Sequence, residues 1–264
     1  MKEKANSKYV PKVRFELIPI KNLVSNQEYQ RNLSAAHIRR TAENFNLYQI
    51  NLVKVSRRDS VNYVINGQHT VEIVAIVSGS RDTPVWCMVY DDLDYKREAD
   101  IFAQQQKYTK YLSPYEVFKA NVEAGSDEQL IIKELVESYK IAITPQQKSS
   151  CAICAVSTLE YIYRQHGFHV LDRTLRLCVG TWEGEVDSLS ASMLRGVSRL
   201  VVAFGDSIND DVFKEKVGQQ TARHISRTAK ERNAGTRGYA EAMLDIYNKK
   251  MKIPLKWSKL HNTQ

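Results

Sequence analysis

A glycine followed by a histidine stands where an apolar strand is expected to turn into a helix. The residues before Gly67 are mostly β-branched and apolar, and the glycine permits a tight backbone exit from the strand. Gln68, His69 and Thr70 then fall on the first helical turn, where backbone N–H groups and the helix dipole favour a phosphate or carboxylate. The pattern predicts an anion pocket, with an ordinary polar helix cap as the alternative.

His69 is the residue of this turn that can transfer a proton. It can orient a phosphate or act as an acid or base, and Glu72 and Glu43 are its candidate partners. These three residues form the candidate catalytic set of a phosphotransferase or nuclease. An imidazole that only caps the helix is the alternative interpretation of His69.

The segments around the turn alternate between short β-rich runs and short helical runs, as in a small α+β domain over residues 15–110. A basic flexible arm, residues 1–14, precedes this domain. The arm has no apolar core segment, so we expect no secretory signal and a cytoplasmic location. Strands are expected over 13–18, 51–56, 62–65 and 85–90, and helices over 34–45 and 68–78.

The pattern beyond residue 110 is helical. Ser113 and Pro114 are typical of a helix start, and Thr144 with Pro145 predicts another. The fold class is therefore α+β, with a small N-terminal domain followed by an all-helical domain over 111–264. Further helices are expected over 127–139, 153–165, 189–204, 211–231 and 238–251.

The net charge of +8 is concentrated near the C-terminus, where residues 214–264 hold twelve Lys and Arg against four Asp and Glu. Arg223, Arg227 and Lys230 share one helical stripe, and Arg232 and Arg237 extend it through a turn. Clustered cations release counterions together when they meet phosphates, so this surface favours DNA as a partner. A solvated helix face is the alternative.

Several motifs resemble, in order, the N-terminal domain of the ParB partition proteins and their relative sulfiredoxin. They are a polar segment with Gln30 and Arg31, the turn at residues 66–70, and a segment over 103–116 that includes Gln105 and Gln106. The resemblance covers about residues 15–120. The Gly-Gln-His element is similar to a "DGQHR" branch of ParB-like proteins that mobile elements and phages encode.

The resemblance implies a nucleotide-phosphate site at Gln30, Arg31, Gln105, Gln106 and the turn from Asn66 to Thr70. Gln68 replaces the reactive cysteine of sulfiredoxin, so redox chemistry is not expected. The family's phosphate-holding arginines and its metal-coordinating Glu-Asn pair are replaced too, which argues against metal-assisted CTP hydrolysis. A nucleotide with Mg²⁺ is the cofactor that the family implies, and no protein metal site is expected because the Cys pair at 151 and 154 lacks further ligands.

ParB proteins carry a helix-turn-helix after this domain. The resemblance therefore implies a recognition helix that begins at Pro145 and exposes Gln146, Gln147 and Lys148 to base edges. An ordinary helical bundle is the alternative.

The favoured hypothesis is a ParB-like DNA-binding protein of a bacterial mobile element or phage. DNA is the expected partner, a nucleotide is a second, and association into homo-oligomers is left open. The alternatives are a phosphotransferase or nuclease that acts at the Gly67 turn, and a non-catalytic protein-interaction module.

Overall fold

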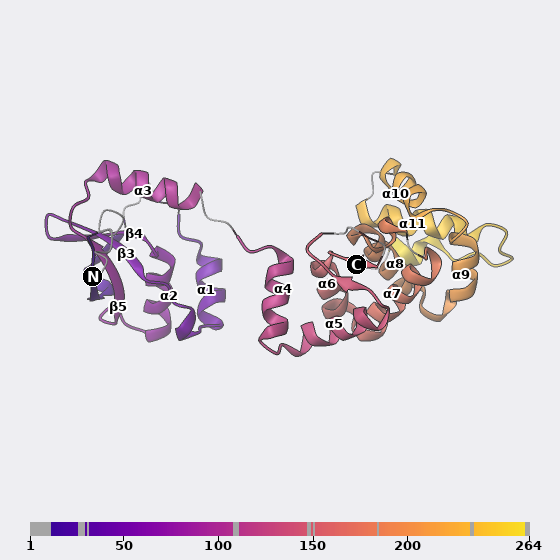
Figure 1. Ribbon diagram of the computed structural model, residues 1–264, viewed down its shortest axis with the longest axis horizontal. Coiled ribbons are helices and arrows are strands. Elements are labelled where there is room, and N and C mark those ends of the chain that lie inside the picture. Colours follow the sequence, from indigo (N-terminus) through magenta and orange to yellow (C-terminus); the bar gives the residue numbers. More distant parts are fainter. Residues whose placement is uncertain are drawn as a thin grey trace, which may run out of the picture. The chain divides into compact units, whose positions relative to one another are not determined.

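The chain folds into two compact units, Met1–Lys110 and Tyr111–Gln264 (Figure 1). The computed structural model describes residues 12–25, 30, 32–107, 111–146, 149, 151–183, 185–232 and 235–261, and only the backbone of Gln106. No helix among these residues has both the length and the apolar character needed to cross a bilayer.

The first unit is built on a mixed sheet with the strand order β1-β5-β3-β4-β2. The strands are β1 (Arg14–Pro19), β2 (Leu23–Ser25), β3 (Val53–Arg58), β4 (Val61–Asn66) and β5 (Pro84–Tyr90). Strands β3 and β4 form an antiparallel hairpin, while β3 runs parallel to β5 and β2 runs parallel to β4. The hairpin turn is tight because Asp59 and Ser60 both have positive φ angles, 51° and 62°.

Helices pack on both faces of this sheet. The helices are α1 (Ala35–Glu43), α2 (Gln68–Ser78) and α3 (Tyr95–Lys107). Alternate residues of β3, such as Val53 and Val55, are fully buried in one core with Val71 and Val74 of α2. Helix α3 lies on the opposite side of β3 and β4 from α2 (Figure 1).

A buried ion pair holds α3 against the sheet. Glu98 of α3 has no exposed surface, and its Oε1 accepts a hydrogen bond from Arg58 Nε at 3.3 Å. The guanidinium also lies 4.5 Å from the ring centroid of Tyr63 and 6.0 Å from that of Tyr95. The hydrogen bond with Glu98 raises the pKa of Arg58. The pair therefore fixes the first turns of α3 over the β3–β4 hairpin.

The second unit is mainly helical. Its helices are α4 (Pro114–Glu123), α5 (Asp127–Ser138), α6 (Val156–His166), α7 (Phe168–Thr181), α8 (Ala191–Phe204), α9 (Asp210–Val217), α10 (Ala222–Glu231), α11 (Gly235–Asn248) and α12 (Trp257–His261). Helices α8 and α11 contact each other closely, because a Cβ on Gly196 would lie only 2.6 Å from Tyr239 Cβ. Met193 and Met243 are fully buried beside this crossing, so it forms part of the core.

The structure confirms the α+β fold class and corrects three expectations within the helical unit. The helix expected at Pro145 is not formed by the described residues there, because Thr144 N–H donates to Ile153 O at 2.9 Å in a short parallel strand pair. The pair consists of β6 (Ala142–Ile143) and β7 (Ala152–Ile153). The expected helix 211–231 is divided into α9 and α10, because the Thr221 hydroxyl caps α10 by accepting from His224 N–H at 3.1 Å. Helix α7 was not expected.

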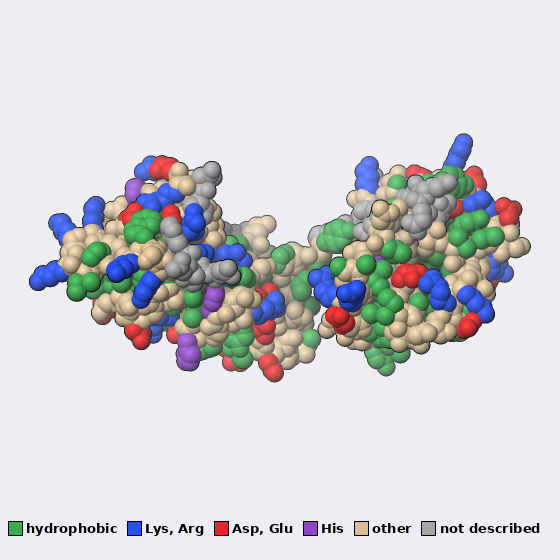
Figure 2. All heavy atoms as spheres, turned by 180° about the vertical axis from the view of Figure 1, so that it is seen from behind, with side chains coloured by type: hydrophobic (Ala, Val, Ile, Leu, Met, Phe, Trp, Pro, Cys, Tyr) green, Lys and Arg blue, Asp and Glu red, His purple; other side chains and the backbone are tan. Residues whose placement is uncertain are grey.

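Hydrophobic side chains remain on the surface, as Figure 2 shows for both units. On the outer strand β1, Leu17 is 52% exposed and lies opposite Trp86 of β5, which is 55% exposed. These side chains lie on the sheet face away from the buried Val85 and Cys87, so that part of the sheet is not covered by a described helix.

Gly67 and Gly79 provide a matched test of the turn from β4 into α2. Both have left-handed φ angles, +102° and +68°, but a Cβ at Gly67 would lie 3.2 Å from Val53 Cα, whereas Gly79 has open space. Each alanine substitution should cost about 1–2 kcal/mol for the backbone conformation. Gly67→Ala should cost more because Val53 must move as well. Chemical denaturation of both variants measures the difference, and equal losses would show that the close approach is unimportant.

The ion pair of α3 can be tested in the same way. Glu98→Ala removes the buried carboxylate and leaves Arg58 without its charged partner, so the melting temperature should fall by roughly 5 °C or more. Asp100→Ala, on the exposed face of the same helix, is the control and should change it little. Thermal unfolding followed by circular dichroism measures both, and equal effects would contradict the proposed role of the pair.

Candidate functional site

A cavity of about 140 Å³ lies at the Gly67 turn. The end of β4, the first turns of α1 and α2, and α3 all contribute to its wall. It is lined by Gln30, His37, Ile65, Asn66, Gly67, Gln68, His69, Thr70 and Phe102. The structure therefore brings Gln30 together with the residues of the turn, although the sequence separates them by more than thirty positions.

Two histidines meet in this cavity. His69 Nε2 accepts a hydrogen bond from the backbone N–H of Ser34 at 3.3 Å, and Ser34 is the residue that caps α1. His37, on the first turn of α1, lies edge to face with His69 at a centroid distance of 5.4 Å. Because Nε2 accepts, the proton of a neutral His69 is on Nδ1. The amino-terminal ends of α1 and α2 therefore converge at the cavity, which favours an anion there.

The side chain of Gln30 gives a second indication of a ligand. It is only 7% exposed, and its Nε2 donates to the carbonyl of Val64. Its Oε1 has no hydrogen-bond partner among the described residues. A buried acceptor left unpaired costs about 1–3 kcal/mol, so a donor supplied by a ligand or by water would be stabilising here.

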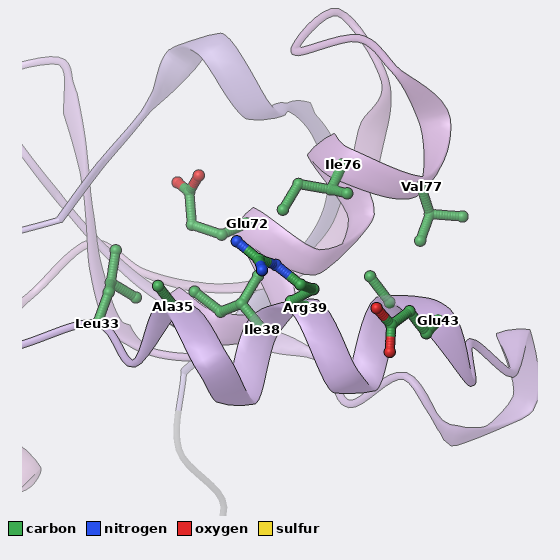
Figure 3. A pocket seen from close by; sticks show the side chains of 9 residues that line it. Leu33, Ala35, Ile38, Arg39, Glu43, Glu72, Ile76 and Val77 are labelled. Carbon is green, nitrogen blue, oxygen red and sulfur yellow. The ribbon is translucent and has the colours of Figure 1, made fainter.

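Glu72 and Glu43 do not join His69 in this cavity. Glu72 accepts two hydrogen bonds from Arg81, at 2.8 and 3.0 Å, and this bidentate pair holds its carboxylate. Both carboxylates line another groove of about 750 Å³, where α1 and α2 lie side by side. Figure 3 shows them at opposite ends of that groove, with Arg39 between. The candidate catalytic set is therefore not assembled around His69.

Gln105 reaches the turn and contacts Asn66. Its Oε1 accepts from Asn66 Nδ2 at 3.0 Å, which ties α3 to the end of β4. Among the described residues, no group of three or more His, Cys, Asp or Glu side chains is arranged to hold a metal ion. Arg31 and the side chain of Gln106 lie outside what the structure describes.

A second hollow, of about 580 Å³, lies along α10 in the helical unit. Ala222, Ile225 and Ala229 are the buried face of this helix, so the residues between them face outward. The hollow is lined by Asp187, Thr221, Arg223, His224, Ser226, Arg227 and Lys230. We call it the α10 groove.

The cations of the α10 groove are not neutralised. Arg223, Arg227 and Lys230 are exposed, and none of them forms an ion pair with a carboxylate in the described part of the chain. Arg227 Nη2 instead donates to Nδ1 of His224 at 3.3 Å. Asp187 is the one carboxylate that lines the groove in the described residues. The three expected cations thus share a surface with a positive potential.

Arg232 and Arg237 do not belong to this surface, contrary to the expected extension of the stripe. Arg232 pairs with Asp245, and its guanidinium lies 5.8 Å from the ring centroid of Trp257. Arg237 Nε lies 3.2 Å from Glu241 Oε1, one helical turn away. Arg232 thereby links the end of α10 to α11, while Arg237 pairs within α11, so both charges are satisfied within the fold.

Of the three residues expected to contact base edges, Gln146 lies in the described part of the chain. Gln146 is exposed, and its backbone carbonyl accepts a hydrogen bond from the Thr144 hydroxyl at 2.9 Å. Gln147 and Lys148 lie outside the described residues. Because the helix expected at Pro145 is absent from the described residues there, Gln146 is not presented by a recognition helix.

Sequence reasoning missed the contribution of α1 to the first cavity. Serine is a preferred helix cap, so the capping role of Ser34 could be predicted from the sequence. In the structure its hydroxyl accepts from His37 N–H at 3.3 Å. Nothing local to α1 indicates that this cap also meets His69 of α2. The contact depends on the packing of two helices, which a single sequence does not specify.

Comparisons with known proteins identify a family but no activity. No curated protein matches the chain. Two solved structures of the C-terminally truncated chromosome-partitioning protein ParB from Caulobacter crescentus are similar at low identity. The one complexed with CTP-gamma-S is 14% identical, covers 88% of this chain and 98% of its own, and has a TM-score of 0.36. The one complexed to the centromeric parS site is 12% identical, covers 87% and 99%, and has a TM-score of 0.27.

Both TM-scores lie below 0.5, so neither structure supports an inference about what this chain binds. The model of a family of unknown function, DUF6551, matches residues 24–255. Because that match spans most of the sequence, the chain belongs to the DUF6551 family.

Proposed function

We propose that the chain is a ParB-like DNA-binding protein of a bacterial mobile element or phage, and that α10 contacts DNA phosphates. The observation that carries the proposal is the row of exposed cations, Arg223, Arg227 and Lys230, that have no acidic partner in the described structure. Cations that form no ion pair with a carboxylate can replace the counterions of a polyanion. The ParB-like order of sequence motifs supports DNA as that polyanion.

The spacing of the row suits phosphates along a strand. At 1.5 Å of rise per residue, the three side chains leave the helix about 6 Å and then about 4.5 Å apart along its axis. Long Lys and Arg side chains can adjust from this spacing to successive phosphates. Such contacts supply affinity for any sequence, because phosphates carry no sequence information.

Substitution of Arg223, Arg227 and Lys230 by alanine tests the proposal. DNA binding should weaken alike for all sequences, and the slope of log affinity against log salt should flatten by about three, close to one per lost contact. Anisotropy titrations with labelled duplexes at several salt concentrations measure the slope.

The matched control is the triple alanine variant of Lys249, Lys250 and Lys252, which removes the same charge from exposed positions after α11. Its slope should change by less than one. If the α10 variant keeps the wild-type slope, or the two variants change it equally, the α10 groove is only a solvated face.

Sequence choice, under this proposal, comes from the segment that contains Gln146 and Gln147. Their replacement should reduce discrimination between duplexes with a smaller general loss of affinity, because amide side chains pair with base edges. The same anisotropy series, run with duplexes of different sequence, measures it. Unchanged discrimination would remove these residues from the proposal.

A second candidate function, binding of a nucleotide phosphate at the Gly67 turn, is favoured by the convergence of the amino-terminal ends of α1 and α2 on the cavity. At about 140 Å³ the cavity is smaller than the roughly 300–1,000 Å³ of sites that enclose whole small molecules. We propose that one phosphate enters the cavity and that the rest of a nucleotide stays outside. The described lining contains no carboxylate, so Mg²⁺ would be held mainly by the nucleotide phosphates.

The catalytic alternative ranks below binding. An acid or base at His69 needs an orienting group, and the structure places both candidate carboxylates in the α1–α2 groove. The convergent helix ends and the Gln30 amide, in contrast, are features of a binding site.

Calorimetry with inorganic phosphate, CTP and ATP tests this second function. Gly67→Ala should abolish binding because its Cβ displaces the turn, whereas Gly79→Ala, with the same kind of backbone strain, should retain it. Absence of binding to the wild type at millimolar ligand would refute the pocket without affecting the α10 proposal.

A further inference from the structure

A third hollow, of about 50 Å³, lies where α6, α8 and the first turn of α11 meet. Its lining includes Tyr161 and His166 of α6, Arg195 and Arg199 of α8, and Thr236 of α11. Three of these side chains are basic, and no carboxylate lines the hollow within the described structure. We propose that this hollow binds one phosphate group, which we call the Arg195 site.

Arg195 is held ready for such a contact. Its guanidinium lies 4.1 Å from the ring centroid of Tyr161, and that ring also packs edge to face against His166 at 6.3 Å. The stacking fixes the plane of the guanidinium but leaves its N–H edge available. Arg195 forms no ion pair in the described part of the chain, so its charge is not satisfied by the fold.

The other groups of the Arg195 site have complementary roles. Arg199 donates to the carbonyl of Leu260 at 3.1 and 3.3 Å, which fixes it in place at the wall. Thr236 belongs to the first turn of the fourteen-residue helix α11, where the helix dipole favours an anion. A volume of about 50 Å³ leaves room for a small group in this hollow.

The Arg195 site and the α10 groove flank the same turn. Lys230 lines the groove, and Thr236, six positions further along the chain, lines the Arg195 site. Their Cα atoms are therefore at most about 21 Å apart. Arg232, directly after α10, pairs with Asp245 of α11. A single polynucleotide can thus supply phosphates to both places. The identification of DNA as the source of the phosphate rests on the proposed function, whereas phosphate binding at the Arg195 site does not.

Protection from an arginine-specific reagent, mapped by mass spectrometry on the full chain, tests the site directly. Inorganic phosphate and a short DNA duplex are the two probes. Each should slow modification of Arg195 at least fivefold, while Arg40, exposed on α1, serves as the internal control and stays unchanged. Protection by phosphate but not by DNA keeps the site and replaces the polynucleotide with a small phosphorylated molecule. Protection by neither overturns the inference.

A variant separates this inference from the proposed function. Arg195→Gln should flatten the salt slope of DNA binding by about one, whereas Lys119→Gln, an equal loss of charge on exposed α4, should leave it unchanged. An altered slope for Arg195→Gln with an unaltered slope for the α10 triple variant would uphold the Arg195 site and refute the α10 groove. The reverse result would assign DNA binding to α10 alone and refute the Arg195 site as a DNA contact.

Discussion

The close approach of Gly67 to Val53 is the constraint on which the first unit depends. A Cβ at Gly67 would lie 3.2 Å from Val53 Cα of β3, so a glycine fits best where the chain makes its left-handed turn and α2 begins at the next residue. That start brings His69 to the cap of α1 and aligns both helix ends on one cavity. The ion pair between Arg58 and Glu98 then secures α3 on the other face of the sheet. The cavity is thus a consequence of how the strand is joined to the helix.

Features encoded within a few residues were predictable from the sequence. Helix α2 begins and ends where expected because a glycine with positive φ bounds it at each end, at Gly67 and Gly79. The start of α4 was readable for a similar reason, since Ser113 and Glu116 form a reciprocal capping box. Four of the five strands of the first unit lie within a few residues of their expected positions, whereas the three-residue strand β2 was not expected.

Features that depend on distant partners were not predictable. The sequence spacing of Glu72 from His69 is suitable for a catalytic pair. In the structure, however, the Glu72 carboxylate accepts hydrogen bonds from Arg81, which lies beyond the end of α2. Pro145 has the composition of a helix start, yet Thr144 just before it donates to Ile153 next to a short strand pair. In each case a local preference worth less than about 1 kcal/mol yields to tertiary contacts of similar or greater strength.

Tertiary contacts also decide which cations of residues 214–264 form ion pairs within the fold and which do not. The cations of residues 214–264 look equivalent in the sequence, but folding divides them by whether a carboxylate lies within reach. Arg232 pairs with Asp245 of α11, which packs beside α10, and Arg237 pairs with Glu241 one turn further along α11 itself. Arg223 and Arg227 are exposed and form no ion pair with a carboxylate in the described part of the chain. Net charge therefore locates a polyanion-binding region only coarsely, and the arrangement of internal ion pairs decides which residues within it can contact phosphates.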